Sequence, residues 1–239
     1  MNDKLQTAIN NNHGLYQAIF NHHGVHLHIQ EDIAYTEKKV PPLYSNLVTR
    51  SKGWRPDHHF TTIDGNYESE NWSEWSVKDS FQALNLSRYG FEKLLDAQWI
   101  YLGRNNFTPV EPSRLQYGLI KTMEDLSSWR LAWNLDVALG KGIFNEKLLD
   151  DPKIHFVAGY DEESIVSGCL VNETDDVLGI SNFFSPDKAI LYWSDVITFL
   201  GALFRHKDIV GYERDSLVNE LVPLGFEGIG NLRVWLKKR

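Results

Sequence analysis

Apolar segments alternate with turns along the second half of the chain. Residues 154–160 and 164–172 are apolar runs joined by a short acidic turn, a pattern typical of a hairpin, and residues 176–184 predict a third neighbouring strand. Residues 187–204 carry apolar side chains at helical spacing and predict an amphipathic helix. A strand at 208–212, a helix that ends at Gly225 and a closing strand complete the predicted order.

Further apolar and polar positions predict the beginning of this half. Residues 116–122 can form an opening strand, and residues 123–136 carry Leu126, Trp129 and Trp133 at helical spacing. The second half is therefore predicted to have the order strand, helical segment, three strands, helix, strand, helix, strand. This order predicts an α+β fold, a mixed α/β arrangement in which a partly antiparallel sheet is flanked by helices.

Three short motifs of the first half recur in the second half in the same order. The pairs are "YSNLVTR" (44–50) with "ISNFFSP" (180–186), "VKDSFQAL" (77–84) with "YERDSLVNEL" (212–221), and "YGFEKLLDAQWIYL" (89–102) with "LGFEGIGNLRVWL" (224–236). Ser45 and Gly90 are 45 residues apart, and Ser181 and Gly225 are 44 apart. We therefore predict two tandem copies of one unit, at residues 1–104 and 112–239.

Two polar features of the repeated units also carry expectations. Asn46 and Asn182 occupy the matched position, and an asparagine inside an apolar strand needs a local hydrogen-bond partner, so each is expected to pin a bulge or a splay. In the first copy, the polar segment 65–75 predicts a long loop whose glutamates are surface acids.

Composition and charge narrow the class of protein. The formal net charge is −8 and basic residues are scattered, which argues against a nucleic-acid partner. No apolar run approaches the roughly 20 residues that span a bilayer, so no membrane association is expected. The single cysteine, Cys169, predicts a reducing, cytoplasmic location and a buried structural thiol. The sequence leaves open whether the protein forms a homodimer.

A metal site is not predicted. His26 and His28 alternate on a predicted strand, so they share a face and could bind one ion. No cysteine or nearby carboxylate completes a ligand set, and a solvated histidine-rich edge explains them as well.

The order of elements in the second half, with the ending "IVGYERDSLVNELVPLGFEGIGNLRVWL" (209–236), resembles the GNAT (GCN5-related N-acetyltransferase) superfamily. The repeat would make this chain a tandem protein with a degenerate first copy. The resemblance implies an acyl-CoA, such as acetyl-CoA, in a gap between two splayed parallel strands. It places pantetheine along Ile180, Ser181, Asn182, Phe183 and Phe184, facing residues 209–212. The pyrophosphate would lie at the start of the next helix, where Ser185 and Lys188 stand.

The chain departs from the family pattern at two places. The pyrophosphate loop of the family contains glycines, whereas this chain has Ser-Pro-Asp-Lys at 185–188, and proline lacks an amide proton. Leu221 stands where many members have a tyrosine that protonates the leaving thiolate. Tyr212 is the nearby tyrosine, on the preceding strand, and we keep it as a candidate catalytic residue.

The sequence leaves two hypotheses for function. In the first, the protein is an acyl-CoA-dependent N-acyltransferase that acts on a small amine, with Glu213 as the candidate general base because an ammonium group must lose a proton before it attacks. In the second, it is a non-catalytic GNAT-like scaffold that binds a partner or a small ligand. The missing glycines and Leu221 favour the second hypothesis, and the resemblance favours the first.

Overall fold

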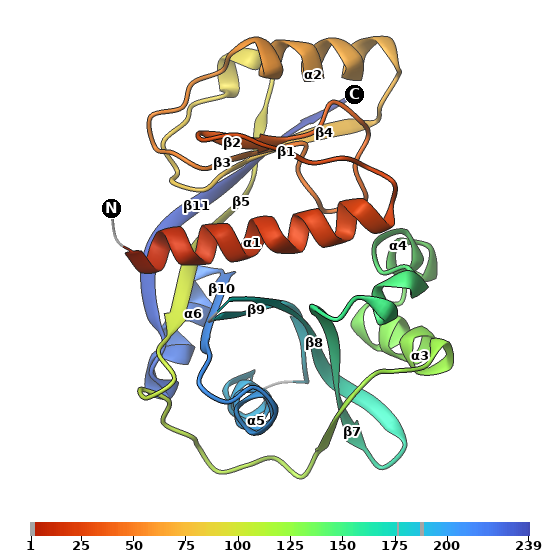
Figure 1. The fold of residues 1–239 in the computed structure, drawn as a ribbon, viewed down its shortest axis with the longest axis vertical. Helices are drawn as coiled ribbons and strands as arrows, with labels where there is room; N and C mark the ends of the chain where they lie inside the picture. The colour runs from red at the N-terminus through yellow and green to blue at the C-terminus, as the bar shows by residue number, and fades with distance from the viewer. Residues whose placement is uncertain (1–2, 176, 187–188) are drawn as a thin grey trace.

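One mixed sheet organises the computed structural model, which describes residues 3–175, 177–186 and 189–239. Within these residues eleven strands are joined in the order β1-β2-β3-β4-β11-β5-β10-β9-β8-β7-β6 (Figure 1). The first half contributes α1 (Asp3–His22), β1 (His28–Ile29), β2 (Ile33–Tyr35), β3 (Leu47–Thr49), α2 (His58–Ser69), β4 (Glu74–Asp79) and β5 (Glu92–Leu102).

The second half follows the order predicted from its apolar pattern. Its elements are β6 (Gln116–Leu119), α3 (Met123–Trp133), α4 (Val137–Ile143), β7 (Ile154–Asp161), β8 (Ser164–Thr174), β9 (Val177–Phe184), α5 (Ala189–Leu203), β10 (Asp208–Glu213), α6 (Asp215–Leu221) and β11 (Glu227–Lys238). Gly225, at φ 100°, ends the helical segment in the left-handed conformation, which favours glycine.

The two halves exchange their final strands. β11 of the second half pairs with β4 of the first, and β5 of the first half pairs with β10 of the second, both antiparallel. β5 and β11 also pair with each other, and Ala97 lies opposite Leu232, each the seventh residue after its left-handed glycine, Gly90 or Gly225. This near-twofold arrangement accounts for the recurring motifs. The predicted copies are therefore joined in one continuous sheet, whereas the sequence suggested a sheet for each copy.

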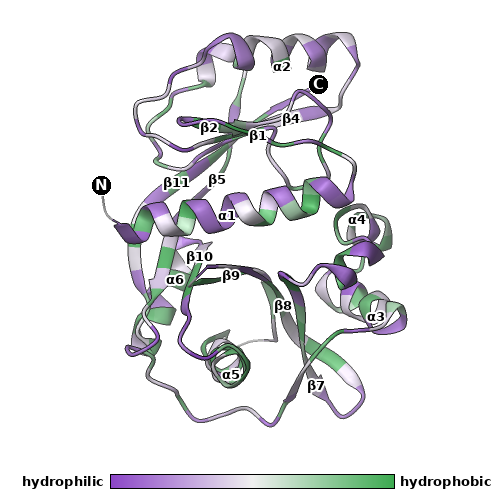
Figure 2. Cartoon of the chain, in the orientation of Figure 1, coloured by the Kyte–Doolittle hydropathy of each residue, from purple (hydrophilic) through white to green (hydrophobic). Residues whose placement is uncertain are grey.

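Helix α1 packs against both halves. Its residues Leu15, Tyr16 and Ile19 join a core with α3, α4, β7 and β8, while Ala8 and Ile9 pack against the exchanged strands β5 and β11. Figure 2 shows hydrophobic and hydrophilic positions interspersed along this helix, and buried Asn11, Asn12 and His13 are among the polar ones. The other face of the second half is covered by α5 and α6.

The polar segment 65–75 is not a long loop, and that prediction was wrong. Helix α2 runs through Ser69, and β4 begins at Glu74. Phe60, Ile63 and Tyr67 lie at helical spacing and are buried, so the apolar stripe of the helix outweighs the polar composition of its other face. Within the described residues, no helix combines the length and the apolar character needed to cross a bilayer.

Candidate functional site at the splayed strands

Strands β9 and β10 run in parallel but pair along only part of their length. Val177, Leu178 and Gly179 lie opposite Asp208, Ile209 and Val210. Beyond this point β9 continues beside β8 as far as Phe184, and β10 continues beside β5 as far as Glu213. Because each strand keeps its outer neighbour and loses its inner one, the two strands diverge toward their carboxyl ends.

Asn182 lies where β9 leaves β10. Its φ of 52° is left-handed, a conformation that asparagine tolerates better than most side chains. The register with β8 shifts between Ser181 and Phe184, so an extra residue forms a bulge there. This is the bulge at the splay that the sequence predicts for Asn182.

In the first copy, Asn46 occupies the position equivalent to Asn182, and it joins the neighbouring segments by hydrogen bonds. Its amide N–H donates to Ser76 O at 3.0 Å, and its Oδ1 accepts from the Ser76 amide at 3.3 Å. Its Nδ2 donates to Lys38 O at 2.9 Å, and Leu47 lies opposite Val77 in the parallel ladder of β3 and β4. The first copy is therefore hydrogen-bonded where the second copy opens. Asn46 has the local backbone partners that the sequence predicts, but it does not open a splay.

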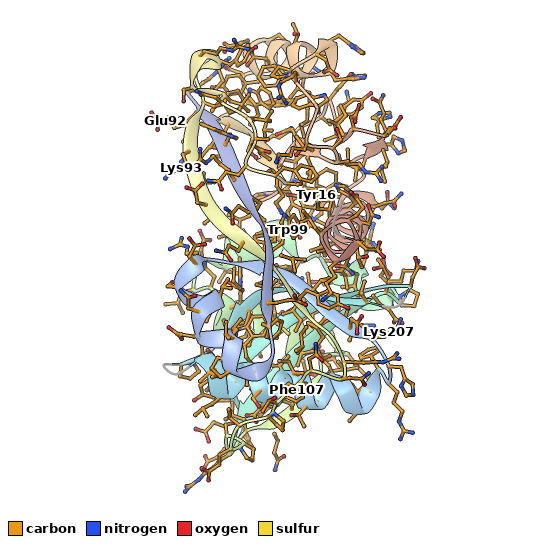
Figure 3. The ribbon with its side chains drawn as sticks, turned by 90° about the vertical axis from the view of Figure 1, so that its left-hand side faces the viewer. Tyr16, Glu92, Lys93, Trp99, Phe107 and Lys207 are labelled. Atoms are coloured by element: carbon orange, nitrogen blue, oxygen red, sulfur yellow. The ribbon has the colours of Figure 1, made fainter. Side chains whose placement is uncertain are left out.

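A cavity of about 290 Å³ lies at the open end of the splay. Both halves line it: Ser181, Asn182, Tyr212 and Arg214 come from the splayed strands and the residue after them, and the first half supplies a wall of aromatic, aliphatic and polar side chains, including Asn12, Leu15, Tyr16, Tyr44, Lys78 and Leu95. Figure 3 shows Tyr16, on α1, and Trp99, on the exchanged strand β5, near the middle of the molecule. We refer to this space as the splay cavity.

Lys78 is the most unusual residue of the splay cavity. It lies on β4 with 2% of its surface exposed, and its Nζ donates to Asn12 Oδ1 at 3.1 Å. The ammonium group lies 4.1 Å from the ring centroid of Tyr212 and 5.0 Å from that of Tyr16. Burial lowers the pKa of Lys78 to about 7, because the apolar surroundings disfavour its charged form.

The predicted coenzyme residues divide between the cavity and the protein core. Ser181 and Asn182 line the splay cavity, and Ser181 Oγ is buried without a hydrogen-bond partner among the described residues. Ile180 is buried, the ring of Phe183 stacks on Trp193 at 4.5 Å, and Phe184 packs on Trp129. These three apolar side chains anchor β9 to the helices on either side of it.

The predicted pyrophosphate turn is described only in part. Ser185 is partly buried just after β9, whereas Lys188 lies outside the described residues. The coenzyme role of both residues stays a prediction.

The two candidate catalytic residues, Tyr212 and Glu213, are neighbours on β10. Tyr212 lines the splay cavity, and burial is the main cause that raises its pKa, so its phenol stays protonated. Burial likewise raises the pKa of Glu213 to about 7, and the Arg214 guanidinium partly opposes this shift. Because strand side chains alternate, Glu213 points away from Tyr212 and is not among the cavity-lining residues.

Two other positions singled out in the sequence have structural roles. Leu221, at the position of the family's tyrosine, is fully buried. Cys169 is also fully buried, and burial raises the pKa of its thiol, which suits a structural residue. The rings of His26 and His28 lie 4.5 Å apart, yet the described residues include no group of three side chains able to hold a metal ion.

The sequence missed the contribution of the first copy to the cavity. Lys78 lies in "VKDSFQAL", a motif that served only to detect the repeat. The strand itself gave no clear signal, because Glu74, Ser76 and Asp79 make it polar at other positions as well. The position of Lys78 beside Tyr212 follows from the exchange of strands, which no local pattern reveals.

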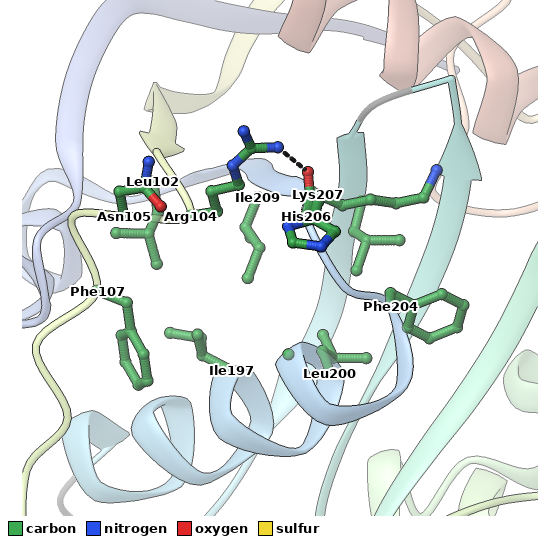
Figure 4. A pocket seen from close by; sticks show the side chains of 12 residues that line it. Leu102, Arg104, Asn105, Phe107, Ile197, Leu200, Phe204, His206, Lys207 and Ile209 are labelled. Carbon is green, nitrogen blue, oxygen red and sulfur yellow. Dashed lines mark hydrogen bonds between the residues drawn. The ribbon is translucent and has the colours of Figure 1, made fainter.

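A second cavity, of about 200 Å³, lies at the opposite end of the same strands (Figure 4). Leu178 and Ile209, which are paired partners, line it together with Leu200 and Phe204 of α5. Arg104 at its edge donates to the carbonyl of His206 at 2.7 Å. The strands are hydrogen-bonded to each other here, so their backbone groups are not free for a ligand, and we place the candidate site at the splayed end.

Comparison with known proteins identifies this architecture. No protein-family model and no curated protein matches the sequence. A functionally unknown conserved protein from Staphylococcus epidermidis has a similar structure, with a TM-score of 0.69 and 11% identity over 89% of this chain and 93% of that one. A GCN5-related N-acetyltransferase from Kribbella flavida gives a TM-score of 0.68 and 11% identity over 99% of this chain and 96% of that one.

A tandem GNAT protein from the clavulanic acid biosynthesis pathway is similar as well. It gives a TM-score of 0.54 and 8% identity over 80% of this chain and 74% of that one. At these identities the comparisons establish the fold. The chain has the fold of the GCN5-related N-acetyltransferases, built as two tandem units.

Proposed function

We propose that the protein is an acyl-CoA-dependent N-acyltransferase that acts on a small amine. The observation that carries this proposal is the divergence of β9 from β10, which opens onto a cavity at the carboxyl ends of both strands. The first copy has no such opening, so the activity is assigned to the second copy. Crevices at the carboxyl ends of parallel strands are common ligand sites.

The residues of the splay fit an acyl-CoA in part. The inner edges of β9 and β10 have backbone groups that pair with no strand beyond Gly179 and Val210, and the Ser181 hydroxyl has no described partner. Ile180 to Phe184 would hold the pantetheine arm by backbone hydrogen bonds. An acyl-CoA bound there would supply the acyl group as a thioester. The turn at 185–188, including Ser185 and Lys188, would lie nearest the phosphates.

Two side chains of β10 suggest how an amine would be deprotonated and how the leaving sulfur would be stabilised. An ammonium group must lose its proton before it attacks a carbonyl carbon. Glu213, with a pKa of about 7, would accept that proton near neutral pH through intervening water, because its side chain lies on the face of β10 opposite to the splay cavity. Tyr212 is protonated and faces the splay cavity, so its hydroxyl can donate a hydrogen bond to the departing sulfur. We place this chemistry in the cytoplasm, in keeping with the single free thiol.

Calorimetric titration with acetyl-CoA and CoA tests the proposal. We expect saturable binding, and we expect Ser185→Glu to weaken it about tenfold by placing a negative charge beside the phosphates. Ser69→Glu adds the same charge at an exposed position at the end of α2 and should leave the affinity unchanged. An absence of heat at millimolar ligand would favour the scaffold hypothesis, which the Ser-Pro-Asp-Lys turn supports.

A further inference from the structure

The splay cavity combines apolar walls with positive charge. Its lining includes the side chains of Leu15, Tyr16, Tyr44, Leu95 and Val234. Its volume of about 290 Å³ lies just below the range of about 300–1,000 Å³ typical of small-molecule sites. These walls suit a compact aromatic or branched aliphatic group.

Two cationic side chains line the splay cavity, and no described lining residue is acidic. Lys78 lies at its buried wall, and Arg214 follows β10 at its exposed margin. Neither forms an ion pair with a carboxylate of the described residues. The carboxyl group of Glu213, next to Arg214, does not offset the positive charge of the cavity lining, because Glu213 points away from the cavity.

The hydrogen-bonding capacity of Lys78 is largely unused. An ammonium group has three donors, and within the described chain one acceptor, Asn12 Oδ1, is present. The rings of Tyr16 and Tyr212 offer electrostatic attraction to the cation but accept no strong hydrogen bond. A buried charge without a counter-ion is costly, and a negatively charged ligand would offset that cost.

We propose that the splay cavity binds a small amphipathic carboxylate, with its apolar body against the aromatic wall and its carboxylate on Lys78 and Arg214. The acceptor amine of the acylation would then be carried by such a carboxylate, as in a free apolar amino acid. This last step rests on the proposed function, whereas the anion site itself does not. An amine without an acidic group would meet two cations and no counter-charge in this cavity.

Three ligands that share a phenyl group test this assignment without any coenzyme. 3-Phenylpropionate carries only the carboxylate, phenylalanine carries the carboxylate and the amine, and phenethylamine carries only the amine. We expect calorimetry and thermal shift to detect the first two and not the third. Lys78→Met should weaken carboxylate binding at least tenfold, and Arg214→Met should weaken it several-fold. Lys52→Met, at an exposed lysine of the first half, should have no effect.

Several outcomes would overturn the assignment. They are binding of phenethylamine as tight as that of 3-phenylpropionate, no binding of any of the three at millimolar concentration, or an unchanged affinity in both Lys78→Met and Arg214→Met. Arg214 is exposed, so its variant remains informative if Lys78→Met fails to fold.

A CoA titration of the same variants separates the two sources of negative charge. If Lys78→Met weakens CoA as much as it weakens 3-phenylpropionate, the cations bind a coenzyme phosphate and the assignment is wrong. Carboxylate binding without CoA binding would retain the anion site and reject the acyltransferase proposal. CoA binding without carboxylate binding would do the reverse.

Discussion

At the scale of single residues, the candidate site residues of the second half could be identified from the sequence, whereas Lys78 could not. The apolar pattern predicted the strands that carry Ser181, Asn182 and Tyr212, the family resemblance singled out these residues, and they line one cavity. Whether they bind a coenzyme or act in catalysis stays a prediction. Lys78 belongs to the same cavity through packing of distant segments, and only the three-dimensional arrangement shows that no carboxylate of the described residues pairs with its charge.

The buried charge of Lys78 predicts a stability cost that depends on pH. The pKa is about 7 in the folded protein and near 10.5 in the unfolded chain. Between these values the unfolded chain holds the extra proton, so the stability of the wild type rises with pH across this window, and below pH 7 the full cost is present. Lys78→Met should therefore stabilise the protein by roughly 2–5 kcal/mol at pH 6, and by much less near pH 10.

Urea unfolding at pH 6 and pH 10 measures this difference. Lys52→Met, which removes an exposed charge, serves as the control and should change the free energy of unfolding by less than about 0.5 kcal/mol. Equal effects of Lys78→Met at the two pH values would contradict the prediction.

The carboxyl of Glu213 predicts the acid limb of the acylation rate. Because its pKa is about 7, the base form is lost as the pH falls through 7, and the rate of the proposed reaction should fall with it. Glu213→Gln should lower kcat about 10²–10⁴-fold and remove this limb. A pH profile of the purified enzyme checks it, with Glu163→Gln in the exposed turn between β7 and β8 as the control. A limb that persists in Glu213→Gln would assign the base to another group.

At the scale of elements, the matched asparagines show how one motif gives two structures. Asn46 uses its side chain to join β3 and β4, while Asn182 forms the bulge at which β9 leaves β10. The sequence predicted that each asparagine pins a bulge or a splay, because an asparagine in an apolar strand needs a local hydrogen-bond partner. The sequence could not distinguish two strands that stay hydrogen-bonded from two strands that diverge, since the difference depends on the backbone groups that the neighbouring strand presents.

The two asparagines should respond differently to substitution. Asn46 is 1% exposed, and Asn46→Ala leaves the Ser76 amide and the Lys38 carbonyl without their side-chain partner, so it should cost roughly 2–3 kcal/mol. Asn182→Gly keeps the left-handed backbone free of strain and should change stability by less than about 1 kcal/mol. Urea denaturation of both variants tests this, and a larger loss for Asn182→Gly would show that its side chain holds the splay.

At the scale of the whole molecule, the order of the second-half elements and the existence of a repeat were predictable, but the pairing between the copies was not. Helices and strands follow local periodicity, which one sequence displays. The partners of β5 and β11 are set by contacts between residues far apart in the chain, such as Asp79 with Arg233. A strand's pattern shows that it needs a neighbour without saying which strand that neighbour is.

The exchanged strands predict that neither half folds alone. Residues 1–111 lack β11, which separates β4 from β5, and residues 112–239 lack β5, which separates β10 from β11. Each fragment, expressed separately, should give the circular dichroism spectrum and the amide hydrogen-exchange rates of an unfolded or aggregating chain. Co-expressed, the two should associate into one complex that elutes at the size of the intact protein. A fragment that unfolds cooperatively by itself would contradict this.

The same exchange governs the order of events during synthesis. Among the eleven strands of the described sheet, β11 is synthesised last, yet it lies inside the sheet, between β4 and β5. Until it emerges, β4 and β5 each present an unpaired edge, and the usual course in which an amino-terminal domain folds before the rest is translated is closed to this chain. The nascent protein is therefore expected to depend on chaperones for longer than a tandem protein whose two units are self-contained.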